Sequence, residues 1–221
     1  MFNTVQQLWQ QGVNLVLPHR CPGCESYLPR QAALGFCASC YAQLPWWNPA
    51  QLLPPKLPRA LTSFHAPLLY EPPLRETLLA LKFADATHLA PLLARLLYPS
   101  LPIGPHTVLV PVPMHPQALR QRTYNQAALL VQELAKLSGL PCDVLSLRRV
   151  RAGEPQHTLT RAGRLRLSRR SFACGPALAG KTVILVDDIM TTGATLAACA
   201  GALKAAGVVA VHGRTLAYTR P

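Results

Sequence analysis

Acidic residues are scarce in this chain of 221 residues: nine Asp and Glu stand against 22 Lys and Arg, for a net charge of +13. A positive field of this size favours polyanions, such as nucleic acid or phosphorylated metabolites, as partners. No apolar run reaches the ~18 residues that a membrane-spanning helix needs. Residues 1–17 lack the basic start of a secretory signal peptide. We therefore expect a cytoplasmic protein without a transmembrane segment.

A predicted buried strand leads into two carboxylates and a hydroxyl-rich turn in the sequence Val183-Ile-Leu-Val-Asp-Asp-Ile-Met-Thr-Thr-Gly-Ala-Thr195. The apolar run 183–186 is typical of a strand covered on both faces of a parallel sheet. Asp187 and Asp188 follow at its end, where open α/β sheets bind ligands and where carboxylates can accept hydrogen bonds from ribose hydroxyls. The predicted helix 194–206 then begins with N–H groups that would meet a phosphate.

Taken separately, these features also fit a solvated acidic turn and an ordinary helix cap. As one continuous string they resemble the 5-phosphoribosyl-1-diphosphate (PRPP) binding signature of type I phosphoribosyltransferases. The resemblance implies that Asp187 and Asp188 hold the ribose hydroxyls and that Mg²⁺ bridges diphosphate and ribose oxygens. It implies that the 5-phosphate is bound by Thr191, Thr192, Gly193, Ala194 and Thr195. Thr191 stands where purine-type members commonly carry an Asp as general base, so binding is predicted but transfer is not.

Two C-x2-C pairs, separated by twelve residues, lie near the start of the chain: Cys21, Cys24, Cys37 and Cys40. Four thiolates at this spacing can surround one tetrahedral Zn²⁺. The alternatives are two disulfides, which would suit a secreted chain, and a redox motif, which would not need two copies. We expect a structural zinc site that uses all four sulfurs and leaves no open position for catalysis.

Positive charge is concentrated between Arg148 and Arg170, where eight arginines accompany a single acid, Glu154. The stretch has no sustained helical or alternating period, which predicts a long loop. Such a loop is a solvated basic surface, a lid over the diphosphate or a binding surface for a nucleic-acid backbone. The last two alternatives rest on the arginine guanidinium, which can donate two hydrogen bonds to phosphate oxygens. The candidate lid or nucleic-acid residues are Arg161, Arg164, Arg166, Arg169 and Arg170.

The remaining segments predict three parts: an N-terminal helix with the zinc module (1–45), a Pro-rich connector (46–72) and the main domain (73–221). Trp46 and Trp47 in the connector either stack on bases or pack between module and core. The region 74–98 predicts two helices divided at Pro91. A strand at 108–112, a loop at 113–122 and a helix at 125–137, closed by Gly139, follow.

The segments Pro111-Val-Pro-Met-His115 and Arg120-Gln-Arg-Thr-Tyr-Asn-Gln126, with Lys82-Phe83 and the four cysteines, resemble the ComF/GntX family. The resemblance implies an α/β fold of the type I phosphoribosyltransferase kind, a parallel sheet flanked by helices, with a small N-terminal zinc-ribbon module. It implies a diphosphate site formed by Val112, Pro113, Met114, His115, Arg120 and Arg122. Thr123 replaces the family's usual Gly, so we expect a different loop path there.

Two classes of function remain open at this point. The family resemblance implies a part in the uptake or utilisation of exogenous DNA, as in competence, with PRPP and Mg²⁺ as ligands. Single-stranded DNA and the DNA-uptake machinery are the partners it implies. The alternative is an active phosphoribosyltransferase that passes ribose 5-phosphate to a nucleobase or another acceptor, with His115 or His157 as a substitute base.

Overall fold

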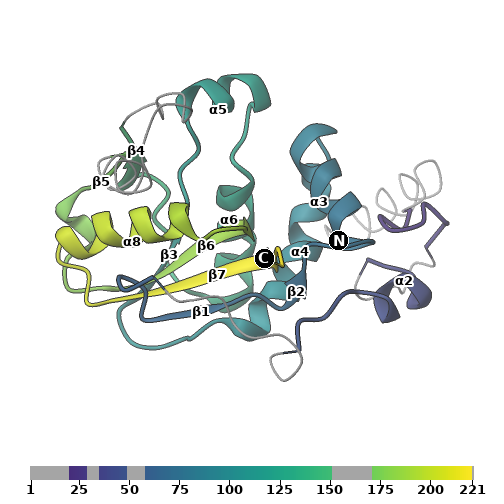
Figure 1. Ribbon diagram of the computed structural model, residues 1–221, viewed down its shortest axis with the longest axis horizontal. Coiled ribbons are helices and arrows are strands. Elements are labelled where there is room, and N and C mark those ends of the chain that lie inside the picture. The colour runs from purple at the N-terminus through teal and green to yellow at the C-terminus, as the bar shows by residue number, and fades with distance from the viewer. Residues whose placement is uncertain (1–19, 29–34, 49–57, 151–170, 221) are drawn as a thin grey trace, which may run out of the picture.

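A parallel β-sheet forms the centre of the computed structural model, which describes residues 20–28, 35–48, 58–150 and 171–220. Its strand order is β1-β7-β6-β3, and β2 also pairs with β7 (Figure 1). The strands are β1 (Ser63–His65), β2 (Leu68–Leu69), β3 (Thr107–Pro111), β6 (Thr182–Met190) and β7 (Ala210–Tyr218). The connector segment therefore supplies two short strands to the outer side of β7.

Helices cover both faces of this sheet (Figure 1). On one face lie α3 (Leu74–Phe83), α4 (Ala90–Leu97) and α6 (Gln126–Ser138), and on the other lies α8 (Ala194–Ala205). Alternate residues of β6 point to the two faces: Ile184 and Val186 pack with α4 and α6, whereas Val183 and Leu185 pack with α8. Burial on both faces explains the uninterrupted apolar run in the sequence.

Seven shorter elements complete the described structure. They are α2 (Ala38–Ala42), η1 (Thr87–Leu89), η2 (Tyr98–Ser100), α5 (Pro116–Arg122), β4 (Leu147–Arg149), β5 (Phe172–Cys174) and η4 (Pro176–Leu178). Strands β4 and β5 pair with each other antiparallel, away from the main sheet.

Local sequence signals account for several boundaries. The side chain of Asn125 caps α6 by accepting a hydrogen bond from the Ala127 N–H, and Gly139 ends the helix in the left-handed conformation with φ 71°. Pro91 lies in the first turn of α4, where a missing N–H has no cost. The predicted pair of helices in 74–98 is confirmed, although they are divided at 84–89 and Pro91 lies just inside the second helix, and the helix that ends at Gly139 is confirmed as well.

Two expectations about this domain were wrong. Residues 116–122, expected within a loop, form α5, so the loop after β3 is limited to 112–115 before this helix. The strand expected at 183–186 continues to Met190, because β7 keeps pairing with it after β3 has ended. Strand β7 itself was not predicted, since His212 and Arg214 interrupt its apolar pattern.

The cysteine module shares its core with the main domain. Cys21, Phe36, Cys40 and Leu44 are buried in one hydrophobic cluster with residues of α3, α4 and α6. The centre of the Trp47 ring lies 5.8 Å from that of Tyr218 and 6.4 Å from that of Phe64, so this tryptophan packs on the sheet. Within the described ranges, no helix has the length and apolar character needed to cross a membrane.

Candidate functional site

The two aspartates lie where β6 extends beyond its neighbour β3. The β3 pairing ends with Pro111 opposite Val186, whereas the β7 pairing continues to Met190 opposite Tyr218. From Asp187 onward, β6 therefore has a strand on one side only. A crevice at the carboxyl end of a parallel strand is where α/β sheets bind ligands. The expected position of both carboxylates at such an edge agrees with the structure.

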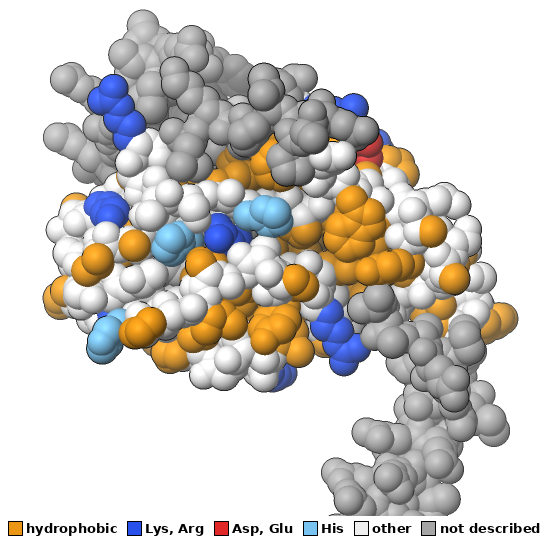
Figure 2. Space-filling view, turned by 90° about the horizontal axis from the view of Figure 1, so that it is seen from below, with side chains coloured by type: hydrophobic (Ala, Val, Ile, Leu, Met, Phe, Trp, Pro, Cys, Tyr) orange, Lys and Arg blue, Asp and Glu red, His pale blue; other side chains and the backbone are white. Residues whose placement is uncertain are grey.

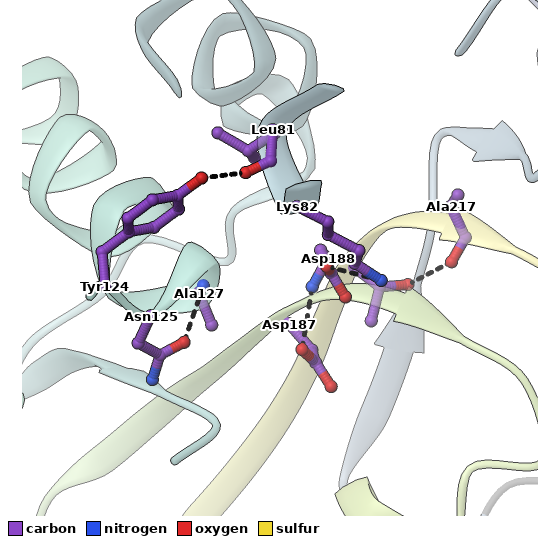
Figure 3. A network of polar contacts seen from close by, with 9 residues as sticks. Leu81, Lys82, Tyr124, Asn125, Ala127, Asp187, Asp188 and Ala217 are labelled. Atoms are coloured by element: carbon purple, nitrogen blue, oxygen red, sulfur yellow. Dashed lines mark hydrogen bonds and ion pairs between the residues drawn. The ribbon is translucent and has the colours of Figure 1, made fainter. Parts of the chain in front are cut away.

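Asp188 points to the face of α3 and is held there by a lysine. It is 8% exposed, and its Oδ2 lies 2.9 Å from Nζ of Lys82 at the end of α3 (Figure 3). A buried carboxylate needs such a cation because it has lost its hydration. Lys82 thus ties α3 to the end of β6.

Asp187 points toward the opposite face and is partly buried. Its Oδ1 accepts a hydrogen bond of 2.9 Å from the Asp188 N–H. Burial, and then the neighbouring Asp188 charge, raise the pKa of Asp187 well above its usual value. A carboxylate desolvated in this way gains from any ligand that brings hydroxyl donors or a cation to it.

The turn after β6 leaves its hydroxyl groups accessible. Thr191, Thr192 and Thr195 are exposed, and the Thr192 hydroxyl oxygen is 3.4 Å from the Ala194 N–H. Gly193, which occupies the N-cap of α8, has φ 73°. Only glycine adopts this conformation easily, so the turn that presents these hydroxyls beside the start of α8 depends on Gly193.

The segment after β3 is fixed to both neighbouring elements. The Val112 N–H donates to the Val186 carbonyl at 2.8 Å, and its own carbonyl accepts from Asn125 Nδ2 at 3.0 Å. Residues 113–115 are half-buried. Arg120 is exposed, whereas the Arg122 guanidinium lies over the Phe83 ring, 4.7 Å from its centre. The structure therefore places Arg122 beside the end of α3.

Thr123 lies in the left-handed region of backbone conformations. Its φ is 64°, which glycine adopts more easily than a β-branched residue, and the expected change in loop path stays a prediction. The next residue, Tyr124, donates its hydroxyl to the Leu81 carbonyl at 2.5 Å (Figure 3). The loop thus reaches α3 despite the strain of a β-branched residue at positive φ.

Sequence reasoning did not assign Lys82 and Tyr124 to the site. Both join α3 to segments more than 40 residues away in the chain, and no local pattern marks such a contact. Asn125 had a usable signal, because an Asn directly before an apolar helical run is a typical N-cap. The predicted lid arginines, Arg161 to Arg170, lie outside the described residues.

The four cysteines of the two C-x2-C pairs come together as expected. Their sulfurs all lie within 4.8 Å of one another, and those of Cys24 and Cys37 are 3.7 Å apart. A tetrahedron with metal–sulfur bonds of about 2.3 Å has edges of roughly 3.8 Å, so the donors fit Zn²⁺. All seven cysteines of the chain are described, and each is a free thiol, which argues against the disulfide alternative.

Backbone donors support the sulfurs of this cluster. The Cys37 N–H points to Cys21 Sγ and the Cys40 N–H to Cys37 Sγ, each at 3.4 Å. Such bonds stabilise thiolates around a metal. A Cβ at Gly23 would lie 3.0 Å from both Cys40 Sγ and the Pro73 Cβ, so the first turn of the cluster packs directly on the start of α3. The cluster fits a closed, structural metal site.

Comparison with known proteins identifies a matching domain family and several relatives. A family model for the phosphoribosyl transferase domain matches residues 125–220. DNA utilization protein YhgH of Salmonella typhi is 33% identical over 150 residues, which cover 65% of this chain and 66% of that protein. Competence protein F of Haemophilus influenzae is 26% identical over 209 residues, 85% of each chain.

Solved structures show a weaker likeness. The allosteric regulatory enzyme of purine biosynthesis aligns with a TM-score of 0.42 at 20% identity, over 59% of this chain and 26% of that one. The matched domain, the parallel sheet flanked by helices and the two named relatives agree with one another. The chain is a ComF-like protein with a phosphoribosyltransferase-type domain.

Proposed function

We propose that this chain binds PRPP together with Mg²⁺ at the carboxyl end of β6 and acts in the uptake or utilisation of DNA. The observation that carries the PRPP proposal is the juxtaposition of the Asp187–Asp188 pair with an exposed threonine turn at the start of α8. The sugar hydroxyls of PRPP need acceptors, and its 5-phosphate needs donors. This edge of the sheet offers both within one short segment.

Each part of the ligand has a place in this proposal. Asp187 and Asp188 accept hydrogen bonds from the ribose, and the 5-phosphate lies against 191–195. The segment 112–115 and Arg120 face the diphosphate. Mg²⁺, when bound, would neutralise charge on the diphosphate oxygens. Lys82 fixes the position of Asp188 by its 2.9 Å ion pair, so that the carboxylate does not have to be ordered when PRPP binds.

The residues favour binding of PRPP without transfer of its ribose 5-phosphate to an acceptor. Thr191 is exposed on the turn and cannot act as a general base at neutral pH. The role in DNA handling is carried over from the names of the Salmonella and Haemophilus relatives. The net charge of +13 supports a polyanionic partner such as single-stranded DNA.

The test is calorimetric titration of PRPP with Mg²⁺ into the full chain and into Asp187→Asn. The neutral amide of Asn keeps one acceptor oxygen but loses the charge that strengthens its hydrogen bonding to the ribose, so binding should weaken about tenfold or more. Glu76→Gln is the matched control, because Glu76 lies on the exposed side of α3, and it should bind as the wild type does. Equal affinity of wild type and Asp187→Asn would show that PRPP does not bind at β6.

Diphosphate release and DNA binding are measured on the same proteins. Release that requires a nucleobase and Asp187 would identify a transferase instead of a binding module. Single-stranded DNA should bind with a log affinity that falls by roughly 0.7 per released counterion as log salt rises. A chain that binds PRPP but no DNA at low salt would refute the DNA part alone.

A further inference from the structure

A buried arginine lies on β7, on the face of the sheet that α4 covers. Arg214 is only 6% exposed. Its Nε donates to the Ser100 carbonyl at 2.7 Å, and its Nη1 donates to the Gly213 carbonyl at 2.7 Å and to Ser63 Oγ at 3.2 Å. These bonds use three of the five guanidinium N–H groups. Both N–H groups of Nη2 remain for another acceptor.

All the protein acceptors of Arg214 are neutral. Eight of the nine acidic residues lie in the described ranges, and none of these eight forms an ion pair with it. Burial lowers the pKa of Arg214 to about 10, which leaves it protonated at neutral pH. A desolvated cation without a counter-charge is costly, and an anion that reaches Nη2 would remove that cost.

A cavity of about 550 Å³ opens beside this arginine. Its lining includes the polar side chains of Ser63, His65, Arg95 and Arg214 and the aromatic side chains of Tyr41 and Trp46. Trp46 is 45% exposed, and the Tyr41 ring meets it edge-on with centres 5.9 Å apart. On the face shown in Figure 2, imidazole and basic side chains lie near apolar areas, and little acidic surface is visible.

We propose that this cavity binds one nucleotide unit, with its phosphate on Arg214 and its base against Trp46. An arginine fork matches two phosphate oxygens, and the base of any nucleotide can stack on an aromatic ring. The volume lies in the range of small-molecule sites. The unit comes from a free mononucleotide or from the phosphorylated end of a DNA strand, since both offer the same chemistry.

This site is separate from the proposed PRPP site. Arg214 pairs in register with Val186, and its side chain lies under η2, whereas the threonine turn follows Met190 on the far side of Asp188. The walls of the cavity come from α2, the connector, β1, α4, η2 and β7. Nucleotide binding here does not require PRPP binding.

The experiment titrates deoxyadenosine monophosphate into the full chain, Arg214→Lys, Trp46→Leu and Asp187→Asn. We expect Arg214→Lys, which keeps the charge but loses the fork, and Trp46→Leu each to weaken binding about tenfold or more. Asp187→Asn should bind like the wild type. Arg220→Lys is the matched control, because Arg220 forms an exposed ion pair with Glu71 after the end of the same strand.

Several outcomes would overturn the proposal. These are no binding to the folded wild type, equal binding of deoxyadenosine without phosphate, unchanged affinity in Trp46→Leu, and loss of binding in Asp187→Asn. The Trp46 variant decides the question even if Arg214→Lys does not fold, because Trp46 is a partly exposed residue. A 5′-phosphorylated oligothymidylate that binds more tightly than its unphosphorylated form would identify a strand end as the source. Equal binding of the two oligonucleotides would identify a free mononucleotide.

Discussion

The ion pair between Lys82 and Asp188 offers a direct test of how the site is held together. The change Lys82→Met keeps the length and most of the volume of the side chain but removes its charge. Asp188 would then remain buried beside Asp187 without its cation. The side chains of Lys82 and Asp188 are 20% and 11% exposed, so both charges are largely shielded from water.

The size of the effect follows from the distance and the burial. At 2.9 Å, with an effective dielectric constant near 20, the gross attraction is about 6 kcal/mol. Part of this is offset by the desolvation of both charges. Removal of one partner of a buried pair typically costs about 3–5 kcal/mol, and partial exposure puts this pair near the lower end. A loss of about 3 kcal/mol should lower the Tm by roughly 6–12 °C for a protein of this size.

Urea unfolding and thermal melting at neutral pH measure this loss. The matched control is Lys136→Met, which removes an even shorter ion pair of 2.6 Å to Glu133 on the surface of α6, where the lysine is 70% exposed. It should cost about 0.5 kcal/mol or less. The double variant Lys82→Met/Asp188→Asn should recover most of the stability, because no buried charge is left unpaired. If Lys82→Met and Lys136→Met cost the same, the reasoning from burial is wrong.

Three further experiments test other parts of the structure. Asp187→Asn should stabilise the ligand-free chain relative to the wild type, and increasingly so as pH rises above about 4. The pKa of Asp187 is raised in the folded state, so the wild type loses stability over this range as the unfolded state releases the Asp187 proton first. A difference in Tm between the two proteins that stays constant from pH 4 to 8 would contradict this. Cys37→Ser should lose bound zinc and have a lower Tm. Cys142→Ser is the control and should do neither, because Cys142 is an exposed cysteine outside the cluster. Metal analysis that finds full zinc in Cys37→Ser would exclude four-thiolate binding. Thr123→Gly should raise the free energy of unfolding by about 1 kcal/mol, because glycine adopts φ 64° without strain. Gly139→Ala should lower it by about as much, because Gly139 has φ 71° while the space around it is open. Unchanged urea midpoints in both variants would refute the argument from backbone strain.

Much of this fold could be predicted because its signals are local. The helix 126–138 carries its own cap residues at both ends, and the apolar run in β6 reflects burial on both faces. The cysteine cluster is set by one short turn and by the start of α2, where Cys37 is the N-cap and Cys40 lies in the helix, and the spacing of both pairs is fixed in the sequence. Predictions failed where the length of an element depends on a strand distant in the sequence. Strand β6 extends to Met190 because β7 continues to pair with it.

The sequence predicted the strand and the turn of the site but not the basic residues Lys82 and Arg214. Asp187, Asp188 and the threonine turn are contiguous, so their order alone indicates a sugar-phosphate site. Lys82 is one of many basic residues, and nothing near it in the sequence shows that it pairs with a carboxylate 106 positions later. Arg214 likewise stands in a strand that periodicity did not reveal, because a buried cation interrupts the apolar pattern. In a chain with so few acids, each buried cation must find either one of them or a ligand. Lys82 has Asp188, and this is the physical reason to look for an anion at Arg214.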